Sequence, residues 1–145
     1  MFQFKRTPRQ PSDEKQSEGG LIVITTDPVF GSSLSEIASS CGWKCRQAPT
    51  VENAMPLLLA ESIPLVIVDG RYGDDDWQQA FSRLHQLAPE RCLLLASSAA
   101  DPYLWQEVIR LGGFDLLNRS ASRDETVRRL MFAWFCTESA RKQGR

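Results

Sequence analysis

The chain has 145 residues, of which 17 are Lys or Arg, 18 are Asp or Glu, and one is His. The length suits one domain with its own hydrophobic core. The near-neutral charge argues against a nucleic-acid partner, which would require a basic face. A single His argues against His-rich zinc sites and against Ser-His-Asp catalysis.

Cysteine spacing and hydropathy indicate the compartment. The four cysteines lack the two matched pairs of a zinc ribbon. No apolar run approaches the ~20 residues of a membrane span, and the polar N-terminus is unlike a secretory signal. We therefore expect a cytoplasmic protein with reduced thiols and no membrane contact.

Three segments are expected along the chain. Residues 1–20 combine Pro, Gly, Gln, Ser and charges of both signs, which is typical of a disordered tail. Residues 21–138 form the predicted domain, and residues 139–145 form a polar C-terminal end that we expect to fray.

Short apolar runs alternate with helical patterns. Continuous runs rich in branched side chains predict buried parallel strands, over residues 21–24, 64–68, 92–96 and 114–117. A fifth candidate over residues 44–48 is half polar, which suggests a strand at the sheet edge. Helix-start signals lie between and after them, at Asp27-Pro28, Thr50, Asp76, Asp101-Pro102 and the Ser122/Glu125 capping box. In the second helix, Pro56 should kink the helix or delay its start.

Apolar spacing predicts which aromatic residues are buried. The fourth helix is expected to bury Trp105, Val108 and Ile109. Most tryptophans should fill the core or its grooves. In the last helix, Trp134 and Phe135 belong to a stretch that is apolar almost all round, which would mark a partner surface if exposed.

The alternating order predicts an α/β fold. Five strands joined by right-handed helical crossovers fit a flavodoxin-like (βα)5 doubly wound sheet with strand order 2-1-3-4-5. Such a fold places its site at the carboxyl ends of the strands around the switch point.

The residues at those strand ends resemble a known family, the receiver domain of bacterial two-component response regulators. "LVIVDG" places Asp69 where the family has its phosphoacceptor aspartate. "LLLASSAADP" places Ser97, and "GGFDLLNRS" places Arg119, where the family has residues that contact the phosphoryl group. The resemblance implies a non-enzymatic signalling domain that acts in a phosphorelay.

The departures from the family pattern concern the acidic site. The family's acidic pair, which holds Mg²⁺ beside the acceptor, is Thr25 and Thr26 here. Only Asp27 and Asp69 remain as metal ligands, so Mg²⁺ binding is expected to be weak or vestigial. Arg119 replaces the family's Lys, and Leu116 stands at the position of the switch aromatic residue.

Two interpretations of the site remain open. Phosphoryl transfer to Asp69 without Mg²⁺ should be slow, whereas Arg119 could pair with Asp69 and mimic a fixed signalling state. The run Asp74-Asp75-Asp76 either supplies further carboxylates or simply begins a helix.

The resemblance also suggests partners. A stand-alone receiver would dock to a sensor histidine kinase or another signalling protein. It would form a homodimer through the family's fourth helix, fifth strand and fifth helix. The alternatives are a phosphorylation-independent scaffold and a flavodoxin-like binder of FMN or phosphate at the TTDPVFGSS segment.

Overall fold

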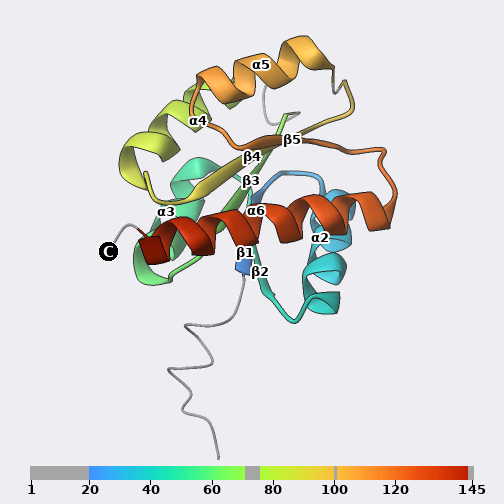
Figure 1. The fold of residues 1–145 in the computed structure, drawn as a ribbon, viewed down its shortest axis with the longest axis horizontal. Helices are drawn as coiled ribbons and strands as arrows, with labels where there is room; N and C mark the ends of the chain where they lie inside the picture. Colours follow the sequence, from blue (N-terminus) through green and yellow to red (C-terminus); the bar gives the residue numbers. More distant parts are fainter. Residues whose placement is uncertain (1–19, 71–75, 100, 144–145) are drawn as a thin grey trace, which may run out of the picture.

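Five parallel strands alternate with five helices in residues 20–70, 76–99 and 101–143, the part of the chain that the computed structural model describes (Figure 1). The strands are β1 (Gly20–Ile24), β2 (Lys44–Ala48), β3 (Leu65–Asp69), β4 (Cys92–Ser97) and β5 (Asp115–Asn118). The helices are α2 (Pro28–Ser40), α3 (Val51–Ala60), α4 (Asp76–Leu87), α5 (Pro102–Arg110) and α6 (Arg123–Gln143).

The strand order is β2-β1-β3-β4-β5, which confirms the predicted flavodoxin-like topology. Neighbouring strands are in parallel register, with Ile22 of β1 opposite Arg46 of β2 and Val66 of β3. The predicted tail, apart from Gly20, lies outside the described residues.

Helices cover both faces of the sheet, so the central strands bury both sides. One set of strand residues packs with α3, α4 and α5: Ile22, Ile24, Val66, Val68, Leu93, Leu95 and Leu116. The alternate set packs with α2 and α6: Leu21, Val23, Leu65, Ile67, Cys92, Leu94, Ala96 and Leu117. Because side chains alternate along a strand, continuous apolar runs are what a sheet covered on both faces requires.

The predicted helix starts are confirmed. The Asp27 carboxylate accepts hydrogen bonds from the backbone N–H groups of Val29 and Phe30, and Asp101 accepts one from Leu104. Thr50 caps α3 by accepting from the N–H of Asn53. The helix therefore begins at Val51 with Pro56 inside it, and Pro56 does not delay its start.

The prediction for α5 was wrong in one respect. Val108 is fully buried, but Trp105 and Ile109 are 45% and 40% exposed. The buried stripe is instead formed by Val108 together with the partly buried Leu104 and Leu111, spaced four and three residues apart. This narrow stripe suffices because α5 covers the sheet near its edge, where only β5 lies beyond β4.

The last helix is longer than predicted. α6 continues to Gln143, whereas a fraying polar end was expected over residues 139–145. An ion pair between Arg141 and Glu138, together with basic residues in the last turn, favours the helical state there. Within the described ranges, no helix combines the length and apolarity that crossing a membrane would need.

Candidate functional site

Polar side chains gather at the carboxyl edge of the sheet. Asp69 is the last residue of β3, and Thr25 directly follows β1. Among the residues that the structure describes, these two are the only buried polar or charged ones, 2% and 7% exposed. Burial of a carboxylate carries a large desolvation cost, so Asp69 must be compensated by its neighbours.

Thr25 provides one compensating contact. Its hydroxyl donates a hydrogen bond of 2.6 Å to Oδ2 of Asp69. The same hydroxyl accepts a bond of 3.0 Å from the backbone N–H of Asp27, which fixes its orientation. Thr25 thus serves Asp69 as a hydrogen-bond donor at a position where the family has a metal-binding carboxylate.

Arg119, which follows β5, provides the balancing positive charge. Its Nη1 lies 3.0 Å from Oδ1 of Asp69, and its Nη2 donates a 2.7 Å hydrogen bond to Oδ2 of Asp27. The contact with Asp69 is electrostatic rather than directional, because the Nη1–H bonds are not aligned on the carboxylate. One guanidinium therefore bridges the two carboxylates that were expected to be metal ligands.

Two further contacts fix Arg119: its guanidinium lies over an aromatic ring, and its backbone is hydrogen-bonded to β4. The central carbon of the guanidinium lies 4.0 Å from the centre of the Phe30 ring, a cation–π contact from the first turn of α2. The backbone N–H of Arg119 donates to the carbonyl of Ser97 at the end of β4. With only 12% of its side chain exposed, Arg119 is packed into the site rather than extended into solvent.

Asp27 acts as both helix cap and ion-pair partner. The N–H groups at the start of α2, first that of Phe30, and then Arg119 hold the pKa of this carboxyl below its usual range. Both effects favour the ionised form. Asp27 therefore caps α2 and pairs with Arg119 at the same time.

The side chains of the remaining predicted residues take no part in the contacts between Thr25, Asp27, Asp69 and Arg119. The Ser97 hydroxyl accepts from the backbone N–H of Ala99, which is a local turn contact. Thr26 is exposed, and Leu116 is buried in the core beneath α5. The Asp74 and Asp75 positions and the side chain of Asp76 lie outside the described residues.

The described residues do not fit a Mg²⁺ site. The ion requires near-octahedral oxygen ligation, usually with carboxylates to supply charge. Asp27 and Asp69 both contact the Arg119 guanidinium, whose charge opposes a second cation. In the described ranges, no group of three or more His, Cys, Asp or Glu side chains could hold a metal.

Sequence reasoning anticipated the pairing of Arg119 with Asp69 as one alternative but missed two partners. Asp27 was expected to be a metal ligand, and no role in the site was predicted for Phe30. A signal was available for Asp27, since it is the only carboxylate left at the end of the first strand and faces an Arg that needs a counter-charge. Nothing in the spacing distinguished the Phe30 ring from its apolar neighbours.

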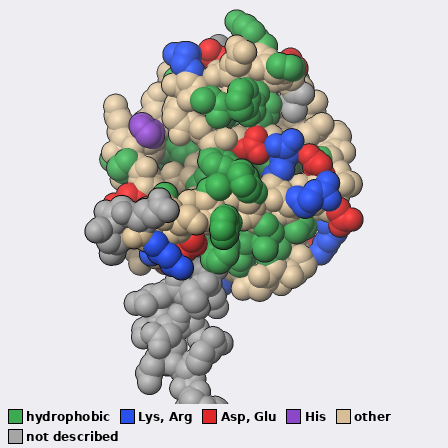
Figure 2. All heavy atoms as spheres, in the orientation of Figure 1, with side chains coloured by type: hydrophobic (Ala, Val, Ile, Leu, Met, Phe, Trp, Pro, Cys, Tyr) green, Lys and Arg blue, Asp and Glu red, His purple; other side chains and the backbone are tan. Residues whose placement is uncertain are grey.

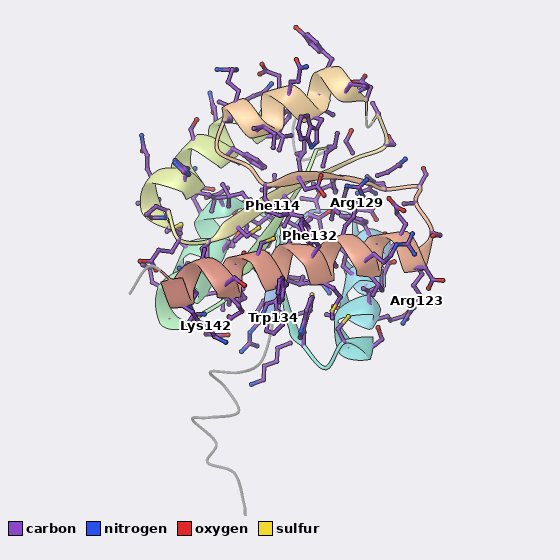
Figure 3. All side chains as sticks on the ribbon, in the orientation of Figure 1. Phe114, Arg123, Arg129, Phe132, Trp134 and Lys142 are labelled. Carbon is purple, nitrogen blue, oxygen red and sulfur yellow. The ribbon has the colours of Figure 1, made fainter. Side chains whose placement is uncertain are left out.

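The predicted interface residues differ from one another. Trp134 is half-buried against Trp43, with ring centres 5.9 Å apart, whereas Phe135 is 63% exposed. Phe132 is 60% exposed and packs against Phe114 at 5.9 Å. Figure 3 shows Phe114 and Phe132 on the β5 side of α6 and Trp134 on the opposite side.

One sizeable hollow in the described part of the chain lies away from this site. A cavity of about 740 Å³ lies at the amino ends of β4 and β5, lined in part by Cys92, Phe114 and Thr137. Because parallel strands share their direction, this cavity is at the opposite end of the sheet from Asp69. The polar network at the carboxyl edge therefore remains the candidate site.

Comparison with solved structures gives the fold a precedent. NtrX from Brucella abortus in complex with ADP superposes with a TM-score of 0.79 at 16% identity, covering 88% of this chain and 28% of NtrX. A CheY-like response regulator receiver domain from Methanospirillum hungatei has a TM-score of 0.75 at 14% identity, covering 85% of this chain and 98% of that one. The beryllofluoride-activated NtrC4 receiver domain dimer gives 0.73 at 17%, covering 81% and 98%.

These likenesses establish the receiver-domain fold. The chain spans less than a third of the length of NtrX. No family model matches the sequence, and no curated protein does.

Proposed function

We propose that this chain is an atypical receiver domain that signals by binding other proteins, with Mg²⁺-dependent phosphorylation of Asp69 weakened or lost. Receiver domains are generally non-enzymatic modules of phosphorelay signalling that interact with histidine kinases and other signalling proteins. This chain has their fold, with Asp69 at the carboxyl end of the central strand β3.

The observation that carries the proposal is the double contact of Arg119 with Asp27 and Asp69. Phosphoryl transfer brings an anionic donor to an anionic acceptor, and a metal ion normally screens their charges. Here a guanidinium already neutralises the acceptor, and it occupies both carboxylates from which a metal site would be built. Phosphorylation would have to displace Arg119 from a nearly buried position.

The bridge also fixes the relative position of three elements. Asp27 begins α2, Asp69 ends β3 and Arg119 follows β5, so a single side chain ties them together without a ligand. A receiver with these ties has one stable arrangement at its signalling end. We therefore propose that its partners read a permanent surface rather than one switched by phosphate.

The exposed apolar side chains of α5 and α6 supply a surface for such a partner. Trp105, Ile109 and Phe132 are each at least 40% exposed. Figure 2 shows hydrophobic side chains gathered on the face that carries α5 and α6. Exposed apolar surfaces of this kind mark protein-binding sites, and a sensor histidine kinase or another signalling protein is the partner we propose.

The phosphate-binding alternative has less support. A binder of FMN or phosphate would use the free N–H groups at the start of α2. The N–H groups of Val29 and Phe30 already donate to the Asp27 carboxylate, whose charge would repel a phosphate.

Incubation with acetyl phosphate and Mg²⁺, followed by intact mass measurement, tests the proposal. We expect no phosphoryl adduct under conditions that label a conventional receiver domain run in parallel. Rapid labelling that requires Mg²⁺ and is abolished by Asp69→Asn would overturn it.

A further inference from the structure

The outward face of α6 carries a regular stripe in which every residue but the half-buried Glu138 is exposed. Its six residues are spaced four, three, four, three and four apart, namely Asp124, Arg128, Met131, Phe135, Glu138 and Lys142. At 3.6 residues per turn they fall within an arc of about 80°. Alternating steps of three and four are the spacing of a helix that packs along another helix.

The middle of this α6 stripe is apolar and exposed. Met131 is 44% exposed and Phe135 is 63% exposed, while Leu130 and Ala133 on the inner face are buried. Phe132, which packs on Phe114, lies outside the stripe on the side toward β5. The stripe is therefore a surface separate from the contact between Phe114 and Phe132.

The order of charges along the stripe is self-complementary about Ala133. Asp124 and Lys142 each lie nine residues from Ala133, Arg128 and Glu138 each lie five, and Met131 and Phe135 each lie two. Each acidic position thus has a basic position at the same distance on the other side.

We propose that the α6 stripe binds the same stripe of a second copy, with the two helices antiparallel and related by a two-fold axis near Ala133. Such a contact requires a surface complementary to itself. The antiparallel arrangement sets Asp124 against Lys142 and Arg128 against Glu138 at both ends, and sets Met131 against Phe135 in the middle. An unrelated partner would impose no such symmetry on the sequence.

The present ion pairs are compatible with this contact. Arg128 pairs with Glu125 at 3.1 Å and Glu138 pairs with Arg141 at 3.0 Å, both within one helix. The Arg128 side chain is 71% exposed, so it can be shared with a second helix at small cost, whereas the Glu138 side chain is 19% exposed and the stripe is least open there. A contact through one helix is smaller than a standard interface, so the dimer should be weak.

Sedimentation equilibrium of the full chain, over about 10 µM to about 1 mM, tests the stripe. We expect the wild type to self-associate and Phe135→Glu to weaken association about ten-fold or more. Leu59→Glu, at a 77% exposed position on α3 across the sheet from α6, is the matched control and should leave association unchanged. Circular dichroism verifies that each variant is folded.

Charge reversal tests the antiparallel register. Asp124→Lys and Lys142→Asp should each weaken association about five-fold, because each reverses two symmetry-related pairs. Combining the two changes restores both pairs and should restore the wild-type constant. In a parallel dimer each of these residues would face its own copy, so every variant would keep like-charge pairs and neither single reversal would weaken association.

Three outcomes would overturn the proposal: a wild type that stays monomeric throughout, a double variant without rescue, or a dimer lost in Leu59→Glu but kept in Phe135→Glu. None of these depends on whether Asp69 accepts phosphate, so failure here leaves the proposed function to its own test.

Discussion

The Nη1 atom of Arg119 lies 3.0 Å from Oδ1 of Asp69, so a guanidinium faces the carboxylate at the end of the central strand. Asp69 is 2% exposed and the Arg119 side chain is 12% exposed. Removing one member of a buried pair leaves the other charge uncompensated, and that cost usually exceeds the worth of the pair itself. Single and double substitutions at these two positions can therefore measure how far Arg119 compensates the buried charge of Asp69.

Arg119→Met should lower the free energy of unfolding by about 3 kcal/mol, because the Asp69 carboxylate loses its counter-charge inside the fold. Urea denaturation at neutral pH measures the change. Arg128→Met, at a largely exposed position, is the matched control and should change stability by about 0.5 kcal/mol or less.

Adding Asp69→Asn to Arg119→Met should recover much of the loss, since the buried charge is then removed. If the Arg119→Met variant is as stable as the Arg128→Met control, then Arg119 does not compensate the buried charge of Asp69.

Thr25→Val should lower the free energy of unfolding by about 1 to 3 kcal/mol, since the Asp69 carboxylate loses a buried hydrogen-bond donor. Thr25→Ser keeps the hydroxyl and should lose clearly less. Thr26→Val, at the exposed neighbouring position, serves as the control in the same denaturation series. Equal losses for the Val and Ser variants at position 25 would assign the effect to packing instead.

Asp27 should make stability depend on pH in acid. Its pKa is held below the ordinary value of 3.8, first by the Phe30 N–H and then by Arg119. A carboxyl with a depressed folded pKa stabilises the fold fully above its unfolded pKa, and that contribution is lost as pH falls through the folded pKa.

Asp27→Asn tests this, because Asn remains a good helix cap but carries no charge. The stability difference between wild type and variant, measured by urea denaturation, should be constant from pH 7 to about pH 5. It should shrink as the pH drops below the ordinary carboxyl pKa of 3.8. A difference that stays constant down to pH 2 would mean that the Asp27 charge adds nothing.

Restoring the family's residues should restore metal binding. In Thr25→Asp/Arg119→Lys, a carboxylate replaces the hydroxyl beside Asp69. The compact ammonium group of Lys, on a flexible chain, replaces the planar guanidinium that bridges Asp27 and Asp69. We expect saturable Mg²⁺ binding by calorimetry in this double variant, provided that circular dichroism shows it folded. If the variant folds and binds no Mg²⁺, the metal site requires more than these two positions.

Much of the fold was predictable because a sheet covered on both faces demands continuous apolar strands. The runs ending at Ile24 and Val68 therefore indicated both the strands and the switch point. The Asp-Pro starts of α2 and α5 were equally local signals. Trp105 was mispredicted because apolar spacing alone cannot distinguish the stripe beginning at Leu104 from the one beginning at Trp105.

The site was only partly predictable, because its contacts join residues far apart in the sequence. Family spacing brought Asp69 and Arg119 to the same edge of the sheet, but the Asp27–Arg119 bond and the Phe30 ring depend on side-chain orientation. The α6 stripe was not predicted, because the stretch around Trp134 is apolar almost all round and its sequence alone does not show which side is exposed. The spacing of its charges was visible in the sequence but acquired meaning only when Met131 and Phe135 proved exposed.

The central claim is that Arg119 closes the site to Mg²⁺ and to phosphate. Titration with Mg²⁺ and beryllofluoride, followed by tryptophan fluorescence, tests it most directly. Trp77 is buried in the same cluster as Val68, the residue before Asp69, and can report a change at the strand end. We predict no saturable change in the wild type, whereas Thr25→Asp/Arg119→Lys should respond. A saturable wild-type response that Asp69→Asn abolishes would contradict the account.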